Sequence, residues 1–142
     1  MHTEQVGAPA PLRRREVEPS AWRADPRFAA ATEVSSATRL LVTGMLGPTD
    51  EAGVVLHEHD AVAQVALSVA NLEQVLAAAG MGLRDVLRLE IATVDLDTIR
   101  SHLDLVVERF GACGCRPALC LTTVAALPQP GALLNLQVVA AA

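Results

Sequence analysis

Apolar residues recur every three or four positions between Val62 and Leu76, which predicts an amphipathic helix over about residues 61–79. Asp60 is suited to cap the start of this helix, and Gly80 to end it. A second helix is predicted after Asp97, taken as its N-cap, with an apolar stripe and two glycines at its end: Ile99, Leu103, Val106, Val107, Phe110, Gly111 and Gly114.

Period-two patterns predict strands on both sides of these helices. Residues 85–94 alternate, which places Leu89 and Ile91 on one face and Arg88 and Glu90 on the other. Two apolar runs near the end of the chain read as a pair of strands joined by a Pro/Gly turn. The predicted strands are residues 15–19 (ended by Pro19), a strand-like segment near 29–34, and 39–45, 54–56, 85–94, 118–126 and 133–140.

This order of elements predicts an α+β fold in which two helices cover one face of a mixed sheet. The other face carries Glu90, Asn135 and Gln137 among apolar residues, and a sheet face so mixed is typical of an oligomer interface. We expect one domain over residues 15–142, preceded by a flexible lead over residues 1–14. The basic run Arg13-Arg14-Arg15 is then interpreted as part of a solvated tail.

Composition excludes several classes of function. The chain is 142 residues long, has a net charge of −5 and contains one Trp, two Phe and no Tyr. Acidity argues against a nucleic-acid partner, and the lack of aromatic rings argues against base stacking. We expect no membrane partner, because no run of about 18 uncharged apolar residues is evident, and we expect no signal peptide.

The three cysteines are Cys113, Cys115 and Cys120, and their number and spacing fit neither a zinc site nor a disulfide scaffold. We interpret them as free thiols in a reducing compartment, which predicts a cytoplasmic protein. His57 and His59 flank Glu58, but a third metal ligand is not evident, so a solvated loop is the preferred interpretation and no metal site is predicted.

Short motifs along the chain occur in the order and spacing of a known family. They are Leu41-Val-Thr-Gly44, Ala63-Gln64, Asn71-Leu72, Ala77-Ala-Ala-Gly80, Asp85-Val86-Leu87, Val94-Asp95-Leu96, Arg116-Pro117-Ala118, Leu127-Pro128 and Gly131-Ala132-Leu133-Leu134. On these residues the chain resembles the Rid family (RidA/YjgF, deaminase-like hydrolases) over roughly residues 15–141.

The resemblance implies a chorismate-mutase-like fold and a homotrimer with a central barrel and three clefts between subunits. It implies hydrolysis of reactive enamines and imines without a cofactor, with an Arg that grips the substrate carboxylate and a Glu that positions water. In this chain the Arg position falls on Leu119, the Glu position on Asn135, and a second acidic position on Gln137. The chain is therefore expected to be a divergent member that lacks both groups.

Other positions of the family cleft also map onto this chain. Phe28 corresponds to an aromatic lid, and Thr43, Gly44 and Met45 to a loop that lines the cleft. Leu119, Cys120 (through its backbone N–H) and Asn135 complete the expected ligand-binding set. His102 or Leu103 falls at a helix position that often carries a polar cleft residue.

The catalytic residues are unknown from the sequence, with three candidates. Cys120 could act as a nucleophile activated by His102 across a cleft, although a lone Cys on an apolar strand is more often a packing residue. Glu90 could act as an acid or base, although we favour an ion pair with Arg88 of a neighbouring subunit.

Three functions stay open at this point. The first is a divergent Rid enzyme acting on a small, less anionic imine, enamine or related reactive intermediate. The second is a non-catalytic small-molecule-binding or regulatory trimer. The third is different chemistry in a specialised biosynthetic pathway, carried by Cys120, His102 or Glu90.

Overall fold

The computed structural model describes residues 12–17, 27–29, 31–36 and 39–142 of the chain. Six strands, three α-helices and one 3₁₀ turn occur within these residues. In chain order they are β1 (Arg13–Val17), β2 (Ala31–Ser35), β3 (Leu40–Val42), α1 (Ala61–Ala78), η1 (Leu83–Asp85), β4 (Val86–Thr93), α2 (Leu96–Ser101), α3 (Leu103–Ala112), β5 (Ala118–Thr123) and β6 (Leu134–Ala141).

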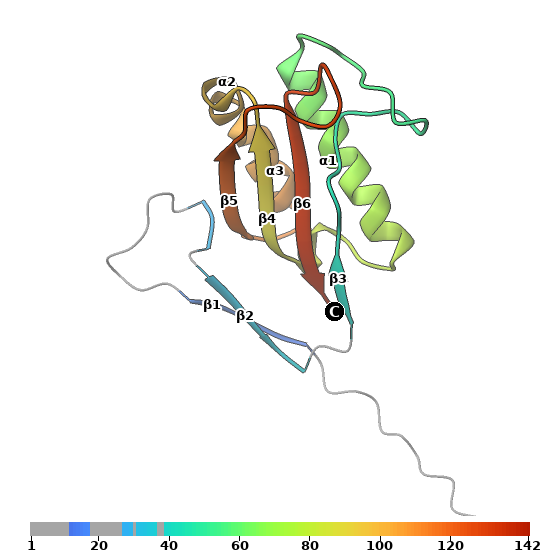
Figure 1. Ribbon diagram of the computed structural model, residues 1–142. Helices are drawn as coiled ribbons and strands as arrows, with labels where there is room; N and C mark the ends of the chain where they lie inside the picture. Colours follow the sequence, from blue (N-terminus) through green and yellow to red (C-terminus); the bar gives the residue numbers. More distant parts are fainter. Residues whose placement is uncertain (1–11, 18–26, 30, 37–38) are drawn as a thin grey trace, which may run out of the picture.

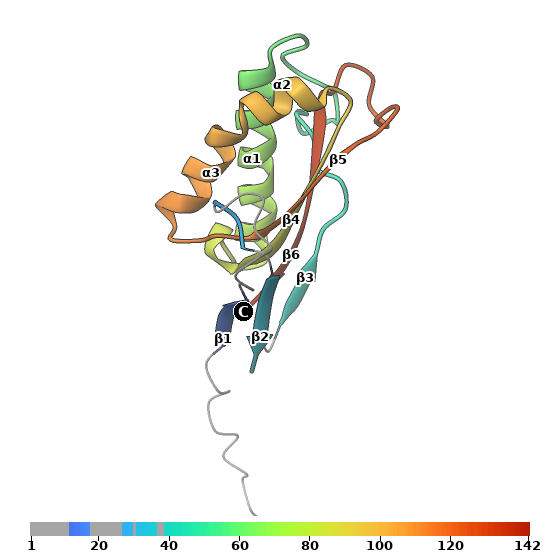
Figure 2. The same ribbon diagram turned by 90° about the vertical axis from the view of Figure 1, so that its left-hand side faces the viewer.

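The main body has two layers. Four strands form a mixed sheet in the order β3-β6-β4-β5, in which β6 is antiparallel to both neighbours and β5 is parallel to β4. α1 and α3 lie on one side of this sheet, and no helix of the described residues covers the opposite face (Figures 1 and 2). The predicted α+β architecture, with helices on one face of a mixed sheet, is confirmed.

The core fills the space between the sheet and the helices, where one face of β4 and β6 meets the apolar stripes of α1 and α3. These side chains are almost fully buried: Val65, Val69, Leu72, Leu76, Leu89, Ile91, Ile99, Val106, Phe110, Leu134, Leu136 and Val138. Aliphatic side chains make up most of this set, so the core is built with little aromatic volume. A β-bulge near Leu87 shifts the register of β4 against β6.

The last two strands are not a hairpin, contrary to the expectation from their sequence. β4 lies between β5 and β6, so the segment joining them passes from one side of β4 to the other (Figure 1). The chain enters β5 from α3, and a helical crossover of this kind places the next strand parallel to the previous one. The pattern of apolar residues predicts where strands occur, but it does not predict which strands are neighbours in the sheet.

Several predicted boundaries also change. Residues 54–56 form no strand, and Val55 makes only an isolated bridge to Thr49. The second helix begins two residues earlier than expected, because Asp95, and not Asp97, caps it by accepting hydrogen bonds from the N–H and hydroxyl of Thr98. The helix is then interrupted at His102 and continues as α3.

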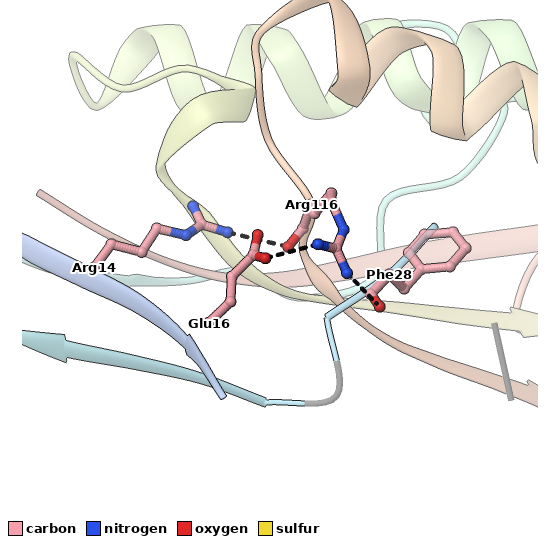
Figure 3. Close-up of polar contacts among 4 residues, drawn as sticks. All are labelled: Arg14, Glu16, Phe28 and Arg116. Atoms are coloured by element: carbon pink, nitrogen blue, oxygen red, sulfur yellow. Dashed lines mark hydrogen bonds and ion pairs between the residues drawn. The ribbon is translucent and has the colours of Figure 1, made fainter. Parts of the chain in front are cut away.

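The basic run is not a solvated tail. β1 begins at Arg13 and pairs with β2, so strand structure begins within the segment that the sequence analysis assigned to a flexible lead, and residues 1–11 of that segment lie outside the described residues. Arg14 donates to the carbonyl oxygens of Arg84 (2.8 Å) and Arg116 (3.5 Å). Arg116 in turn donates to the Glu16 carboxylate (2.8 Å) and to Phe28 O (3.3 Å), as Figure 3 shows. These bonds tie the β1–β2 ribbon to the start of β5.

One helix within the described residues, α1, is long and apolar enough by length and composition to cross a membrane. The sequence analysis found no run of about 18 uncharged apolar residues, and α1 is not such a run, because it contains Glu73 and polar residues such as Gln64 and Asn71. The buried residues of α1 pack against the sheet, and the helix contacts β6 and α3, which is how the core helix of a folded domain behaves.

Candidate functional site

Polar side chains meet on the face of the sheet that the helices leave uncovered. The register pairs Glu90 of β4 with Gln137 of β6 on one side and with Cys120 of β5 on the other. The next row pairs Ala92 with Asn135 and with Thr122. Because side chains two residues apart on a strand share a face, both rows lie on the same side of the sheet.

A cavity of about 210 Å³ lies over these two rows, and we call it the open-face pocket. Its lining contains one carboxylate, two side-chain amides and one hydroxyl among apolar and sulfur-containing side chains. The lining residues are Met45, Glu90, Ala92, Cys120, Thr122, Val124, Asn135 and Gln137.

Glu90 stands between the open-face pocket and a smaller neighbouring cavity of about 80 Å³, which also contains Thr43 and Arg88. Arg88 Nη2 lies 2.6 Å from Glu90 Oε1, and the two side chains are 52% and 37% exposed. Glu90 therefore pairs with Arg88 of its own chain, whereas the sequence analysis expected a partner in a neighbouring subunit.

The Asn135 side chain is almost completely buried at the wall of the open-face pocket. Its Nδ2 donates to Met45 Sδ and Gln129 Oε1, both at the long distance of 3.5 Å. Its Oδ1 has no hydrogen-bond partner among the described residues. A Cβ at position 47 would lie 2.5 Å from this oxygen. The close approach of the loop at position 47 to the Asn135 side chain on β6 therefore requires Gly47.

The loop that carries Met45 is fixed to the helices and to the sheet. Asn71 of α1 donates from Nδ2 to the carbonyl oxygens of Gly47 and Thr49, both at 2.9 Å. The Thr43 hydroxyl accepts from Val138 N at 3.0 Å. Between this loop and α1 lies a more open cavity of about 350 Å³, which shares Met45 with the open-face pocket.

Five of the residues singled out in the sequence come together in the open-face pocket, namely Met45, Glu90, Cys120, Asn135 and Gln137. Thr43 lies in the adjacent cavity beside Arg88. Gly44 is exposed and lies in the loop just before Met45.

Two other expected ligand-binding residues face the interior of this chain. Leu119 is paired with Leu89 and packs against the core, on the side of the sheet opposite to Cys120. Phe28 is 5% exposed and belongs to the core cluster. A ligand in the open-face pocket of the same chain therefore contacts neither side chain.

His102 and Cys120 are not brought together within one chain. His102 lies at the junction of α2 and α3 in the helical layer, whereas Cys120 is on the uncovered face of the sheet. The described residues contain no group of three or more His, Cys, Asp or Glu side chains placed to hold a metal ion.

The sequence analysis did not identify Thr122, Ala92, Val124 or Gln129 as site residues. Strand parity could have found Thr122, which lies two residues after Cys120 on β5. Gln129 had no signal in the sequence, because it reaches Asn135 from the irregular segment between β5 and β6.

Comparison with known proteins places the chain in a family. The family model described as endoribonuclease L-PSP matches residues 20–142. A comparison with curated proteins returned no match.

Solved structures of the same fold cover most of the chain. A protein of the conserved Rid family from Yersinia pestis (YyfB) is 27% identical, with a TM-score of 0.77 and coverage of 91% of this chain and 98% of that one. TdcF from E. coli, solved with bound serine, is 19% identical with a TM-score of 0.66, and the match covers 81% of this chain and 87% of TdcF. A YjgF/YER057c/UK114 family member from Mycobacterium tuberculosis is 23% identical with a TM-score of 0.61, and the coverage is 92% and 100%.

The extent of the family match, together with a two-layer α+β fold shared with these structures, shows that this chain belongs to the Rid family, whose family model bears the description endoribonuclease L-PSP.

Proposed function

We propose that the chain is a Rid-type hydrolase that acts on a small reactive imine, enamine or related intermediate bound at the open-face pocket. The observation that carries this proposal is the position of Glu90, the one carboxylate among the residues that line the pocket. It lies on the strand next to β6 and one row away from Asn135, the position where the family resemblance expects the water-positioning Glu.

Glu90 supplies the chemistry that hydrolysis of an imine needs. A water held by its carboxylate attacks the carbon of the protonated imine, a C–O bond forms, the π electrons of the C=N bond neutralise the nitrogen, and the carboxylate takes one proton from the water. The Glu90 carboxyl group then returns this proton to the nitrogen of the carbinolamine. The C–N bond breaks with its electron pair leaving on ammonia, the carbonyl group forms, and the hydroxyl proton is taken up by the ammonia, so that the protonated imine and water give the carbonyl product and ammonium. Water is the only co-reactant, and no cofactor is required.

The proposal includes a homotrimer whose sheets form a central barrel, with the site in a cleft between subunits. A pocket of about 210 Å³ is smaller than most small-molecule sites, and its face is uncovered in the single chain. A second subunit would enclose it. Exposed apolar side chains along the β3 edge, Leu40, Val42 and Met45, support self-association.

We further propose that the protein is cytoplasmic and has neither a nucleic-acid nor a membrane partner. The net charge of −5 and the single carboxylate in the pocket do not suit an RNA substrate. TdcF was solved with bound serine, and a small ligand of comparable size would fit a pocket of this volume.

The alternatives are a non-catalytic small-molecule-binding trimer and a different reaction run by Cys120, His102 or Glu90. A measurement of imine hydrolysis distinguishes the proposed hydrolase from these alternatives. We would generate a 2-imino acid in situ with a D-amino acid oxidase and a carboxylate-free imine with a monoamine oxidase, and follow ammonia release with and without the protein. 2-Aminoacrylate would serve as a third substrate.

We expect acceleration over buffer for at least one imine, and a loss of about 10²–10⁴-fold in Glu90→Gln, which keeps the size of the side chain but removes the base. Glu108→Gln, an exposed change on α3 with the same change in charge, is the matched control and should keep full activity. Failure to accelerate any of the three substrates would overturn the proposed hydrolase and favour the binding protein. Full activity in Glu90→Gln would remove Glu90 from the mechanism.

A further inference from the structure

The lining of the open-face pocket carries charge of one sign, while its amide and hydroxyl groups can both donate and accept hydrogen bonds. Glu90 contributes a carboxylate, Thr122 a hydroxyl, and Met45 and Cys120 sulfur atoms, while no Arg or Lys side chain is among the lining residues that the structure describes. An anionic ligand would meet like charge here and no counter-charge, whereas a cation would meet an attractive field.

The Asn135 amide adds a buried acceptor to this wall. Both contacts of its N–H groups go to acceptors, Met45 Sδ and Gln129 Oε1, while its Oδ1 is buried without a partner among the described residues. A buried acceptor left in this state destabilises the folded protein. This oxygen lies beside Gly47, while Met45 and Gln129 already accept from Asn135, so Glu90 is the acceptor that the pocket lining offers to an N–H donor.

Arg88 is the cation that moderates this field, and it does so from the neighbouring cavity. It is the one partner of the Glu90 carboxylate among the described residues, and its own side chain is half exposed. An ion pair whose side chains are this exposed to water is weak. A cationic ligand can therefore compete with Arg88 for Glu90.

From these observations we infer that the open-face pocket selects a small cationic ligand with N–H donors, such as an iminium ion or a protonated amine, and discriminates against carboxylates. Glu90 is both the counter-ion and the acceptor of the ligand's N–H bonds, and Arg88 sets the affinity by competing for Glu90. The inference rests on the proposed function in that it concerns the same site. It names the substrate class as imines that carry positive charge and lack a carboxylate.

The test measures binding of stable compounds, so it does not depend on turnover. Propylammonium, propionamide and propionate differ in charge but little in size, and each would be titrated against the protein by isothermal calorimetry at low ionic strength, with chemical-shift changes to locate the site. We expect propylammonium to bind at least tenfold more tightly than propionate, with propionamide between them.

Two variants should change the affinity for propylammonium in opposite directions. Glu90→Gln should weaken propylammonium binding by about tenfold or more, because a charged hydrogen bond is lost. Arg88→Gln should strengthen it, because the competing cation is removed. Glu108→Gln should leave it unchanged, and circular dichroism would confirm that each variant folds.

Tighter binding of propionate than of propylammonium, or a loss of propionate binding in Arg88→Gln, would overturn the inference and make Arg88 an anion-binding residue. Undetectable binding of propylammonium would overturn it as well. Cation selectivity without imine hydrolysis would keep this inference and reject the proposed function, so the two failures are distinguishable.

Discussion

At the scale of single residues, strand alternation decides which side chains reach the open-face pocket. Leu119 and Cys120 are neighbours in the chain, yet Leu119 packs against the core beside Leu89 while Cys120 faces the pocket beside Glu90. A ligand-binding pair made of two consecutive strand residues is therefore split between the two faces. Leu119, where the family resemblance expects the Arg, is a packing residue in this chain.

The cysteines differ in environment and should differ in reactivity. Cys113 is exposed, whereas Cys115 is buried and its Sγ contacts Val86 O at 3.5 Å. Burial raises the pKa of the Cys115 thiol above its ordinary value, and the nearby Arg14 opposes this only partly. Because the thiolate is the reacting species, we expect iodoacetamide to alkylate Cys113 first and Cys115 much more slowly. Peptide mass spectrometry over a time course at pH 8 would measure both rates.

The same raised pKa predicts the direction of a pH effect on stability. The unfolded thiol ionises at lower pH than the folded one, so the stability associated with the neutral Cys115 thiol is fully present below the unfolded pKa and is lost as pH rises through the folded pKa. The free energy of unfolding should then fall in the alkaline range less steeply in Cys115→Ala than in the unchanged protein. Alkylation of Cys115 as fast as Cys113 would contradict this assignment of burial.

At the scale of elements, α1 organises the two loops that surround the site. Its buried Gln64 donates from Nε2 to Leu56 O (3.2 Å) and Gly131 O (2.9 Å), and it accepts from Leu133 N (2.8 Å). Asn71, two turns later, holds Gly47 and Thr49. The amides at these two helix positions replace the regular hydrogen bonds that irregular backbone lacks.

Gln64→Leu should destabilise the protein by about 2–4 kcal/mol, because it leaves one backbone N–H and two carbonyl groups without their partners in a buried place. Urea denaturation followed by circular dichroism would measure the change. Gln74→Leu is the matched control, since Gln74 lies on the same helix but is exposed, and it should change the free energy of unfolding by less than about 0.5 kcal/mol. Equal effects at the two positions would contradict the role of Gln64 as the tie between these loops.

At the scale of the whole molecule, one face of the sheet carries no helix, and the β3 edge pairs with no further strand, among the residues that the structure describes. The open-face pocket lies on that face, and β3 forms the edge, where Leu40 and Val42 are 68% and 66% exposed. An uncovered strand edge with apolar side chains is prone to pair or pack with another chain. These features support the proposed trimer, in which other subunits would bury them.

Val42→Lys should dissociate the trimer, because a charged side chain on the β3 edge opposes burial there. Light scattering coupled to size-exclusion chromatography would give the mass of each form, with a trimer expected for the unchanged protein and a monomer for the variant. Val54→Lys is the control, as Val54 is 56% exposed in a loop away from β3. A monomeric unchanged protein, or a trimer that survives Val42→Lys, would refute this assembly.

The sequence by itself determined the elements and the family. The period of apolar residues located α1 and its Asp60 cap, the strand patterns located β4, β5 and β6, and the spacing of short motifs identified the Rid family, because each of these signals is local in the chain. The sequence also identified Glu90, Cys120 and Asn135 as candidate site residues, because the alternation of residues along a strand and the positions of the motifs both point to them.

Only the tertiary structure decided which strands are neighbours and which atoms meet. It placed β4 between β5 and β6, drew Arg14 and Arg116 into the contacts of the β1–β2 ribbon, and brought Gln129 and Met45 to Asn135. These contacts join residues far apart in the chain or in irregular segments. They are set by packing and by the competition of backbone groups for hydrogen bonds, and no local pattern of apolar and polar residues encodes that outcome.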